Sequence, residues 1–160
     1  MSEAKPRYEI VEACEAHCVA IGPHLRQADR DEVAASCGLE PAEALLSSLR
    51  RSAMCWAGLV DGEPVCVFGV GGPSLMSEVG VPWLLGTDAV VKHQRAFLRR
   101  NKAIVAKMLD AFPVLINMVD ARNVHSIRWL RWLGFHIGEP FAWGVEGRPF
   151  HPFSMRAADV

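Results

Sequence analysis

Two groups of residues in this chain have side chains that can do chemistry. The first is a run of four neighbours, Lys92, His93, Gln94 and Arg95, with cationic or hydrogen-bonding side chains. Lysine and arginine are good partners for phosphate groups, so this run is a candidate phosphate site. The second is His125, the residue type that most readily exchanges protons at neutral pH. Both also fit a plainer interpretation, in which the cations are the solvated face of a helix and the histidine lies at the surface.

The segment that contains His125 predicts a buried strand, a polar turn and a short helix. The apolar, β-branched run over 114–119 is typical of a strand that is covered on both faces, and residues 120–123 interrupt it. Asn123 is placed to cap the helix. Gly134 can end it in the left-handed conformation. Between them, apolar residues recur every three positions on one helix face, at Val124, Ile127, Leu130 and Leu133.

The order of residues across this segment resembles the last signature motif of the GNAT acyltransferase superfamily. The matching positions are Asn123, Ser126, Ile127, Leu130, Leu133, Gly134 and Phe135. The resemblance implies an α/β (α+β) fold, in which a mixed, mainly antiparallel central sheet is flanked by helices, and it implies acetyl-CoA or another acyl-CoA as co-substrate. An ordinary strand, turn and helix of another α/β fold is the alternative.

The remaining elements are predicted in the order that the same superfamily uses. In the first half of the chain we expect a strand over 7–13, a helical region over 15–37 with a break at 22–23, and a helix that opens at 40. Hairpin strands over 53–59 and 64–70 follow, and then a strand over 79–87. In the second half we expect a helix over 94–112 and C-terminal strands on either side of 146–147. A sheet splayed between the strands over 79–87 and 114–120 would leave the gap in which the family places an acyl-CoA thioester.

The resemblance also implies which residues contact the co-substrate. The strand backbone at Leu84, Leu85 and Gly86 would pair with the pantetheine arm, and Asn123 and Ser126 would lie beside it. Many members hold the pyrophosphate in a glycine-rich turn, whereas residues 88–97 contain no glycine here. The run from 92 to 95 would then bind phosphate by charge and hydrogen bonds, which makes this a degenerate pyrophosphate loop.

Proton transfer is a second departure from the superfamily pattern. The position at which many members carry a tyrosine general acid is Leu130, and the only tyrosine of the chain is Tyr8. Leucine cannot donate a proton, so this role would pass to another group or to water. We take His125 as the predicted catalytic residue. The titratable residues in this region of the chain are Glu78, Asp88, Asp120, His125 and His136, and His125 has the side chain best suited to proton transfer at neutral pH.

A looser resemblance covers roughly residues 83–155. It is to GNAT-like proteins of tailed phages and prophages, including internal virion proteins of podophages, and it implies a phage or prophage origin. It rests on Trp83, Phe97, Lys107, Met108, Leu109, Asn117, Val119, Asn123, His125, Ser126, Ile127, Arg128, Leu130, Phe150 and Phe153. The location implied is the cytoplasm of a host cell, or the virion.

Composition sets the remaining expectations. With 160 residues, of which 51% are hydrophobic, and a net charge of -1, we expect a single domain over 1–160 and no general attraction to nucleic acid. No stretch has the pattern of a signal peptide or a membrane span, which predicts a cytoplasmic protein. The five cysteines predict free thiols and no metal site, because Cys14, His17 and Cys18 lack a partner pair of ligands.

Two functions from different classes follow. The first is an acyl-CoA-dependent N-acyltransferase that modifies a small-molecule or protein amine. The alternative is a non-catalytic virion structural or protein-interaction module on the same fold, which binds a phage or host protein. Aromatic residues support such an interface, or a homodimer, and they are Trp56, Trp83, Trp129, Trp132, Phe141, Trp143, Phe150 and Phe153.

Overall fold

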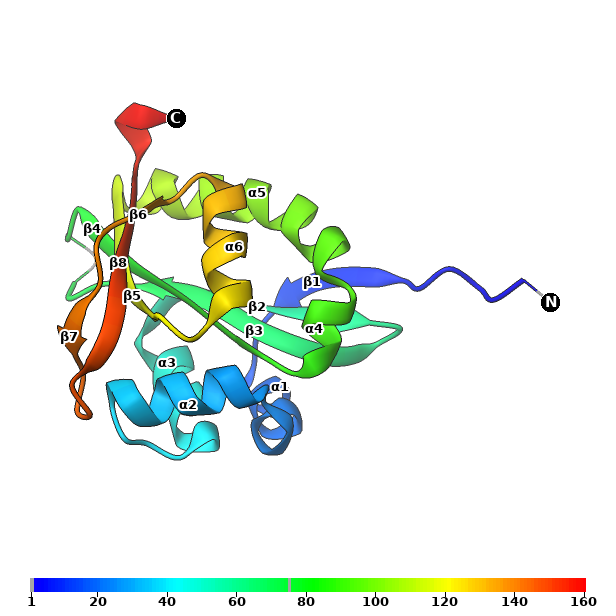
Figure 1. Cartoon of the computed structure of the whole chain (residues 1–160). Helices are drawn as coiled ribbons and strands as arrows, with labels where there is room; N and C mark the ends of the chain where they lie inside the picture. Colours follow the sequence, from blue (N-terminus) through cyan, green and yellow to red (C-terminus); the bar gives the residue numbers. More distant parts are fainter. Residues whose placement is uncertain (1, 75) are drawn as a thin grey trace.

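The computed structural model of the chain describes residues 2–74 and 76–160 (Figure 1). The strands are β1 (Tyr8–Glu12), β2 (Ser52–Val60), β3 (Glu63–Gly71), β4 (Val79–Gly86), β5 (Val114–Asp120), β6 (His136–Ile137), β7 (Phe141–Trp143) and β8 (Arg148–Arg156). The helices are α1 (Glu15–Ile21), α2 (Gln27–Ser36), α3 (Pro41–Arg51), α4 (Asp88–Lys92), α5 (Gln94–Ala111) and α6 (Val124–Leu133), with short 3₁₀ turns at Gly22–His24 and Ala157–Asp159.

Within the described residues the strands form one eight-stranded sheet. Its order is β1-β2-β3-β4-β5-β8-β6, and β7 pairs with β8 to one side. All neighbouring strands are antiparallel except β4 and β5, which are parallel. The predicted mixed, mainly antiparallel sheet is therefore confirmed. The hairpin between β2 and β3 turns at Asp61 and Gly62, both with positive φ, as the Asp-Gly pair predicts.

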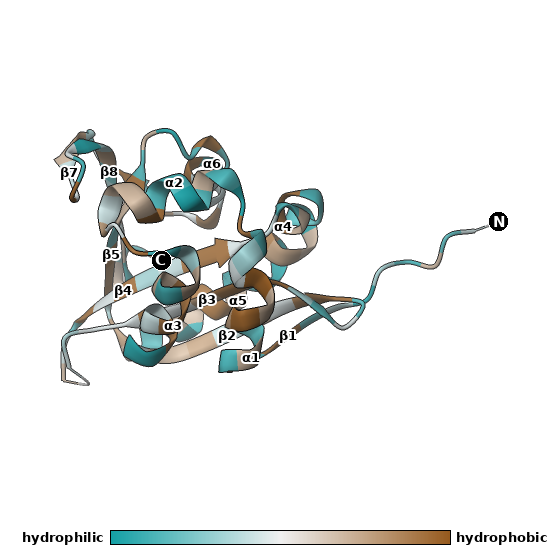
Figure 2. Ribbon diagram, turned by 90° about the horizontal axis from the view of Figure 1, so that it is seen from below, coloured by the Kyte–Doolittle hydropathy of each residue, from teal (hydrophilic) through white to brown (hydrophobic). Residues whose placement is uncertain are grey.

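Helices cover both faces of this sheet (Figure 1). α5 and α6 lie on one face, where Phe97, Ile104 and Met108 join a core cluster with residues of β3 and β5. α1, α2 and α3 lie on the other face, and Leu45 and Val67 belong to its cluster. Figure 2 colours β3 as strongly hydrophobic, which agrees with a strand that is buried on both sides.

The sheet splits between its two parallel strands. β4 and β5 pair only at Val79 with Val114 and at Gly80 with Leu115. Beyond this point the strands diverge, and the Asn117 side chain crosses the space to donate a hydrogen bond of 2.8 Å to the Pro82 carbonyl oxygen. The predicted splay between these strands is confirmed.

The turn and helix after β5 also form as predicted. The Asn123 side chain accepts a hydrogen bond from the Ser126 N–H at the start of α6, and Gly134 ends the helix with φ 102°. The buried face differs from the prediction, because Val124 is exposed whereas Trp129 is buried. The Trp129 ring N–H donates to the Gln94 side chain, which directs this indole inward. Helical periodicity alone does not contain this long-range contact.

The structure contains two short elements, α4 and β6, that the sequence did not predict. Residues 88–92 form the short helix α4 where the sequence predicts a loop, because Thr87 has an extended backbone and lets a helical turn begin directly after β4. The two-residue strand β6 pairs with β8 at His136 and Ile137. Within residues 2–74 and 76–160, no helix combines the length and the apolar character needed to cross a bilayer.

Gly80→Ala should destabilise the fold where the two parallel strands separate. A Cβ at this position would lie 2.7 Å from Phe112 and 2.8 Å from Val70, both in the core. We expect the free energy of unfolding to fall by roughly 1–3 kcal/mol, measured by denaturant titration. Val81→Ala, at the exposed neighbour, is the control and should change it by less than about 0.5 kcal/mol. Equal stability of Gly80→Ala and wild type would contradict this packing.

Candidate active site

A cavity of about 270 Å³ occupies the space between β4 and β5. Its walls include Leu84 and Leu85 of β4 and residues 117–119 of β5. On one face of the sheet α5 and α6 contribute side chains, and on the other face α2 and α3 do so. The cavity therefore extends through the split sheet from one helical layer to the other, so that a ligand could reach it from either face.

The edge of β4 offers backbone groups to this cavity. Alternate residues of an antiparallel strand direct their N–H and C=O groups to opposite neighbours. Gly86 directs both groups away from β3, since its N–H donates to Asp29 (2.9 Å) and its carbonyl oxygen accepts from the Arg26 N–H (2.8 Å). The Pro82 carbonyl also points away from β3, to Asn117. Leu84, between them, has the same orientation, so its N–H and C=O face the gap.

Of the residues predicted to contact the co-substrate here, some line the cavity and others already have their polar groups bonded within the protein. Leu84 and Leu85 line the cavity, and Ser126 joins them from α6. Gly86 has both backbone groups occupied, by Asp29 of α2 and by Arg26, the residue that precedes α2. Asn123 is buried, with its side chain held by Arg26, Asp29 and Glu32. Asn123 thus serves as a structural centre of the site, whereas Ser126 reaches the cavity itself.

The predicted phosphate-binding run is divided between structural and exposed side chains. His93 Nδ1 lies 2.8 Å from the Tyr8 hydroxyl, and Gln94 accepts the ring N–H of Trp129 at 2.8 Å. Lys92 and Arg95 are exposed. The structure thus brings the sole tyrosine to the start of α5, although it is 85 residues away in sequence. The two exposed cations are the members of the run available to a phosphate.

His125 lies at the surface. Its side chain is exposed, and its ring lies 6.1 Å from that of Trp129, centroid to centroid. Among the described residues that line the cavity, His125 does not appear. The same is true of the other titratable residues considered from the sequence, namely Glu78, Asp88, Asp120 and His136. Its role as a catalytic residue stays a prediction.

A buried polar network lies at the end of the gap. The Arg26 guanidinium donates to both carboxylate oxygens of Asp29, at 2.8 and 3.2 Å, and both side chains are almost fully buried. It also donates to Asn123 (3.5 Å) and to the Ser126 hydroxyl (3.2 Å), and it lies 4.9 Å from the centre of the Trp129 ring. Burial raises the pKa of Asp29, and the Arg26 charge and the hydrogen bonds act against this shift.

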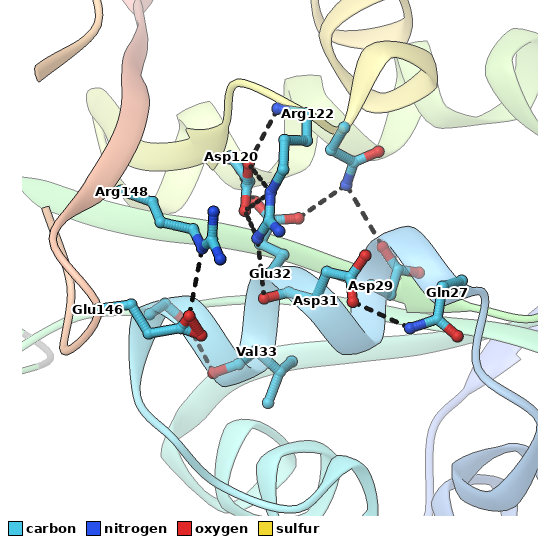
Figure 3. Close-up of polar contacts among 11 residues, drawn as sticks. Gln27, Asp29, Asp31, Glu32, Val33, Asp120, Arg122, Glu146 and Arg148 are labelled. Atoms are coloured by element: carbon cyan, nitrogen blue, oxygen red, sulfur yellow. Dashed lines mark hydrogen bonds and ion pairs between the residues drawn. The ribbon is translucent and has the colours of Figure 1, made fainter. Parts of the chain in front are cut away.

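Glu32 extends the network into the cavity. From α2 it reaches the end of β5, where one oxygen accepts the Asp120 N–H (2.9 Å) and the other accepts the Asn123 amide (2.7 Å) (Figure 3). Burial raises the pKa of this carboxyl group to about 7. Burial also acts to raise the pKa of Asp120, but the hydrogen bonds and charge of Arg122 outweigh it and leave that pKa lowered. The pKa values of these two neighbouring carboxyl groups are therefore shifted in opposite directions.

Sequence reasoning missed this α2 contribution. Asp29 and Glu32 are three residues apart and share a helix face with the buried Val33, which is unusual for a solvated acidic face. Two acids next to a buried position are the signal in the sequence that could have indicated a functional role for this helix. Arg26, the ion-pair partner of Asp29, is only three residues away, but Asn123, which contacts both carboxyl groups, lies more than 90 residues later, and no local periodicity reports such a contact.

One buried polar atom in the cavity wall has no partner. Asn101 of α5 is 8% exposed, and its Oδ1 accepts no hydrogen bond from the described residues. An unpaired buried carbonyl costs free energy unless a ligand or water satisfies it. This amide oxygen therefore marks a position where a ligand donor would be stabilised.

The cysteines are free thiols, as expected from their spacing. Cys18 and Cys66 are buried, and Cys14 contacts His17 with Sγ 3.5 Å from Nδ1 at the start of α1. Within residues 2–74 and 76–160, no group of three or more potential ligands has the arrangement of a metal site.

The structure is similar to solved acetyltransferases along nearly its whole length. With yncA of Salmonella typhimurium, solved with its cofactor acetyl-CoA, the TM-score is 0.66 at 17% identity over 94% of each chain. With the ribosomal-protein-S5-alanine acetyltransferase of Vibrio fischeri it is 0.67 at 14% identity, over 95% of this chain and 94% of that one. An acetyltransferase of the GNAT family from Streptococcus pneumoniae gives 0.62 at 12% identity, over 94% and 99%.

The chain therefore has the GNAT fold, as the Asn123 motif and the element order predict. No protein-family model matches the chain, and no curated protein matches its sequence.

Asp29→Ala should strongly destabilise the protein, because it leaves the buried Arg26 charge without its partner. Removing one member of such a pair costs about 3–5 kcal/mol in free energy of unfolding, which denaturant titration would measure. Asp31→Ala removes a carboxylate on the same helix that is only partly buried, and it should cost less than about 1 kcal/mol. Similar losses in the two variants would show that the buried pair has no special role.

Proposed function

We propose that the protein is an acyl-CoA-dependent N-acyltransferase. The observation that carries this proposal is the cavity between β4 and β5 in a GNAT fold, open toward helices on both faces of the sheet. A thioester that enters from the α5–α6 side would bring its acyl carbon into the gap. An amine that approaches from the α2–α3 side could then attack it.

The residues of the gap fit acetyl-CoA or another acyl-CoA. The pantetheine arm carries two amides, whose N–H and C=O groups match the exposed edge of Leu84 and the unpaired Oδ1 of Asn101. Lys92 and Arg95, both exposed beside the start of α5, are available for the phosphates. The mostly apolar walls would exclude water from the thioester.

The departing CoA thiolate would take its proton from the nitrogen of the attacking amine. Leu130 lines the cavity at the position where many GNAT enzymes carry a tyrosine, and it has no proton to give. Once the amine has added, its nitrogen carries a proton that must leave, and this proton can reach the sulfur directly or through water. The proposal therefore requires no general acid from α6.

Isothermal titration with acetyl-CoA at moderate salt tests the proposal, because salt screens nonspecific charge attraction. We expect a micromolar Kd for wild type and at least a tenfold weaker Kd for the double variant Lys92→Glu, Arg95→Glu, in which two phosphate partners become anions. The control is Lys5→Glu, Lys107→Glu, which makes the same change in net charge at exposed positions elsewhere. No binding by folded wild type up to millimolar acetyl-CoA would refute the proposal, and equal weakening in both variants would remove the predicted run from the site.

A second candidate function is favoured by an exposed apolar surface. Val124 and Trp132 of α6 are 51% and 48% exposed, and Phe141, Trp143 and Val145 extend from the region of β7. As a non-catalytic module, the protein would bind a phage or host protein, or a second copy, through these residues. The glycine-free connection folded as α4 supports this candidate, since it lacks the glycine turn expected of a pyrophosphate site. A phage or prophage origin, in the virion or the host cytoplasm, belongs to the same proposal.

The two neighbouring tryptophans of α6 should respond differently to removal. Trp129→Ala empties a buried position and should cost about 3–5 kcal/mol in free energy of unfolding. Trp132→Ala removes an exposed ring under Lys102 and should cost less than about 1 kcal/mol. Sedimentation velocity would then show whether Trp132→Ala reduces self-association while the fold is kept. Unchanged association would exclude this surface as a dimer interface.

A further inference from the structure

Glu32 is the one carboxyl group among the described residues that line the cavity. It comes from α2, half-buried, on the face of the sheet opposite to α5 and α6. Each of its oxygens accepts one protein hydrogen bond, from the Asp120 N–H and from the Asn123 amide. Because a carboxylate oxygen has two lone pairs, each oxygen can accept a further bond from a ligand.

The surroundings of Glu32 hold it in one orientation. Asn123, which donates to it, is itself fixed by Arg26 and Asp29, and all three side chains are buried. The Asp120 N–H belongs to the end of β5 and cannot rotate away. The carboxyl group is therefore held in place, with no ion pair to another described residue, and among the described lining residues it alone can carry the negative charge that attracts a cation.

The remaining walls at this end of the cavity are largely apolar. Trp83 and Phe150 line it, and Trp143 packs against Phe150 with ring centroids 5.0 Å apart. Ser36 and Ser48, from α2 and α3, are the small polar residues there. A single acid within aromatic walls suits a ligand with one cationic group on an apolar body.

We infer that the α2–α3 end of the cavity binds the acceptor, an amine carried on an aromatic or apolar body, and that Glu32 receives its ammonium group and takes its proton. This inference rests on the proposed acyltransferase function. It assigns the catalytic base to α2, and not to His125.

The proposed step conserves atoms and charge. The Glu32 carboxylate takes one proton from the ammonium group and leaves a neutral amine, whose lone pair forms a bond to the thioester carbon. The carbon–sulfur bond then breaks, and the CoA thiolate receives the second proton that the nitrogen gives up. The products are the amide and CoA thiol, and Glu32 returns its proton to solvent.

The charges around Glu32 suit a base near neutral pH. Asp29 on its own helix and Asp120 on β5 face it and oppose its ionisation, whereas Arg26 and Arg122 neutralise those two carboxylates. With burial as the main cause, the pKa of Glu32 is raised to about 7. The carboxylate form, which can accept a proton, therefore grows as the pH rises through 7, and the rate should rise with it.

The experiment follows CoA thiol release from acetyl-CoA with tryptamine, and with ethanolamine as a polar amine, between pH 5.5 and 9. We expect wild type to use tryptamine in preference to ethanolamine. Its kcat/KM should rise with pH around pH 7, and this rise is the limb of the pH profile that reports the ionisation of Glu32. Glu32→Gln should lower kcat/KM by about 100-fold and abolish this limb, because an amide cannot act as a base. Glu32→Asp keeps a carboxylate and should retain the limb at a lower rate. Glu43→Gln, an exposed acid on α3, is the control and should match wild type.

Titration with acetyl-CoA separates the two proposals. Glu32→Gln should bind acetyl-CoA within twofold of wild type, since Glu32 lies on the acceptor side. If wild type binds acetyl-CoA but acetylates neither amine, or if Glu32→Gln keeps the rate and the limb, the inference is overturned while the co-substrate site stands. If wild type binds no acetyl-CoA, the proposed function fails, and this inference fails with it. Loss of folding in Glu32→Gln, seen by circular dichroism, leaves the decision to Glu32→Asp, whose loss of the limb would overturn the inference.

Discussion

The buried ion pair between Arg26 and Asp29 is the interaction on which the rest of the site depends. Removing both charges from water costs free energy, and this cost is offset by their mutual attraction and by the hydrogen bonds that both side chains make to neighbouring groups. Asp29 also accepts the Gly86 N–H at the end of β4, and Arg26 reaches the cap of α6. This one pair, at the start of α2, therefore joins the end of one splayed strand to the helix that follows the other, and it closes the gap at that end.

The opposite end of the gap is closed by packing. Val79 and Gly80 pair with β5, and Phe112 fills the space over Gly80 so tightly that a methyl group would not fit. Between these two closures the strands have no backbone partners in each other, which leaves the Leu84 edge of β4 facing the cavity. The unpaired side-chain oxygen of Asn101, from α5, is a second polar group within the apolar walls. A protein that leaves such groups unpaired gains stability from a ligand that pairs with them.

The connection after β4 shows how the chain departs from the superfamily while it keeps the fold. Residues 88–92 form a helical turn, and the side chains of His93 and Gln94 hold Tyr8 and Trp129. Two members of the predicted phosphate-binding run thus contribute to packing between β1, α5 and α6. The exposed pair that remains can attract phosphate by charge, although it lacks the close backbone approach that glycine allows.

The sequence by itself determined the elements whose signals are local. The Asp-Gly hairpin, the Asn123 cap, the Gly134 stop and the apolar run of β5 each depend on residues within a few positions, so the strand and helix order, and with it the GNAT fold, could be predicted. Only the tertiary structure decided which side chains meet. Glu32 joins Asn123 across 91 positions, Tyr8 joins His93 across 85, and Trp129 turns inward to Gln94 across 35. Contacts at such separations follow from how whole elements pack, and a pattern read along the chain does not contain that geometry.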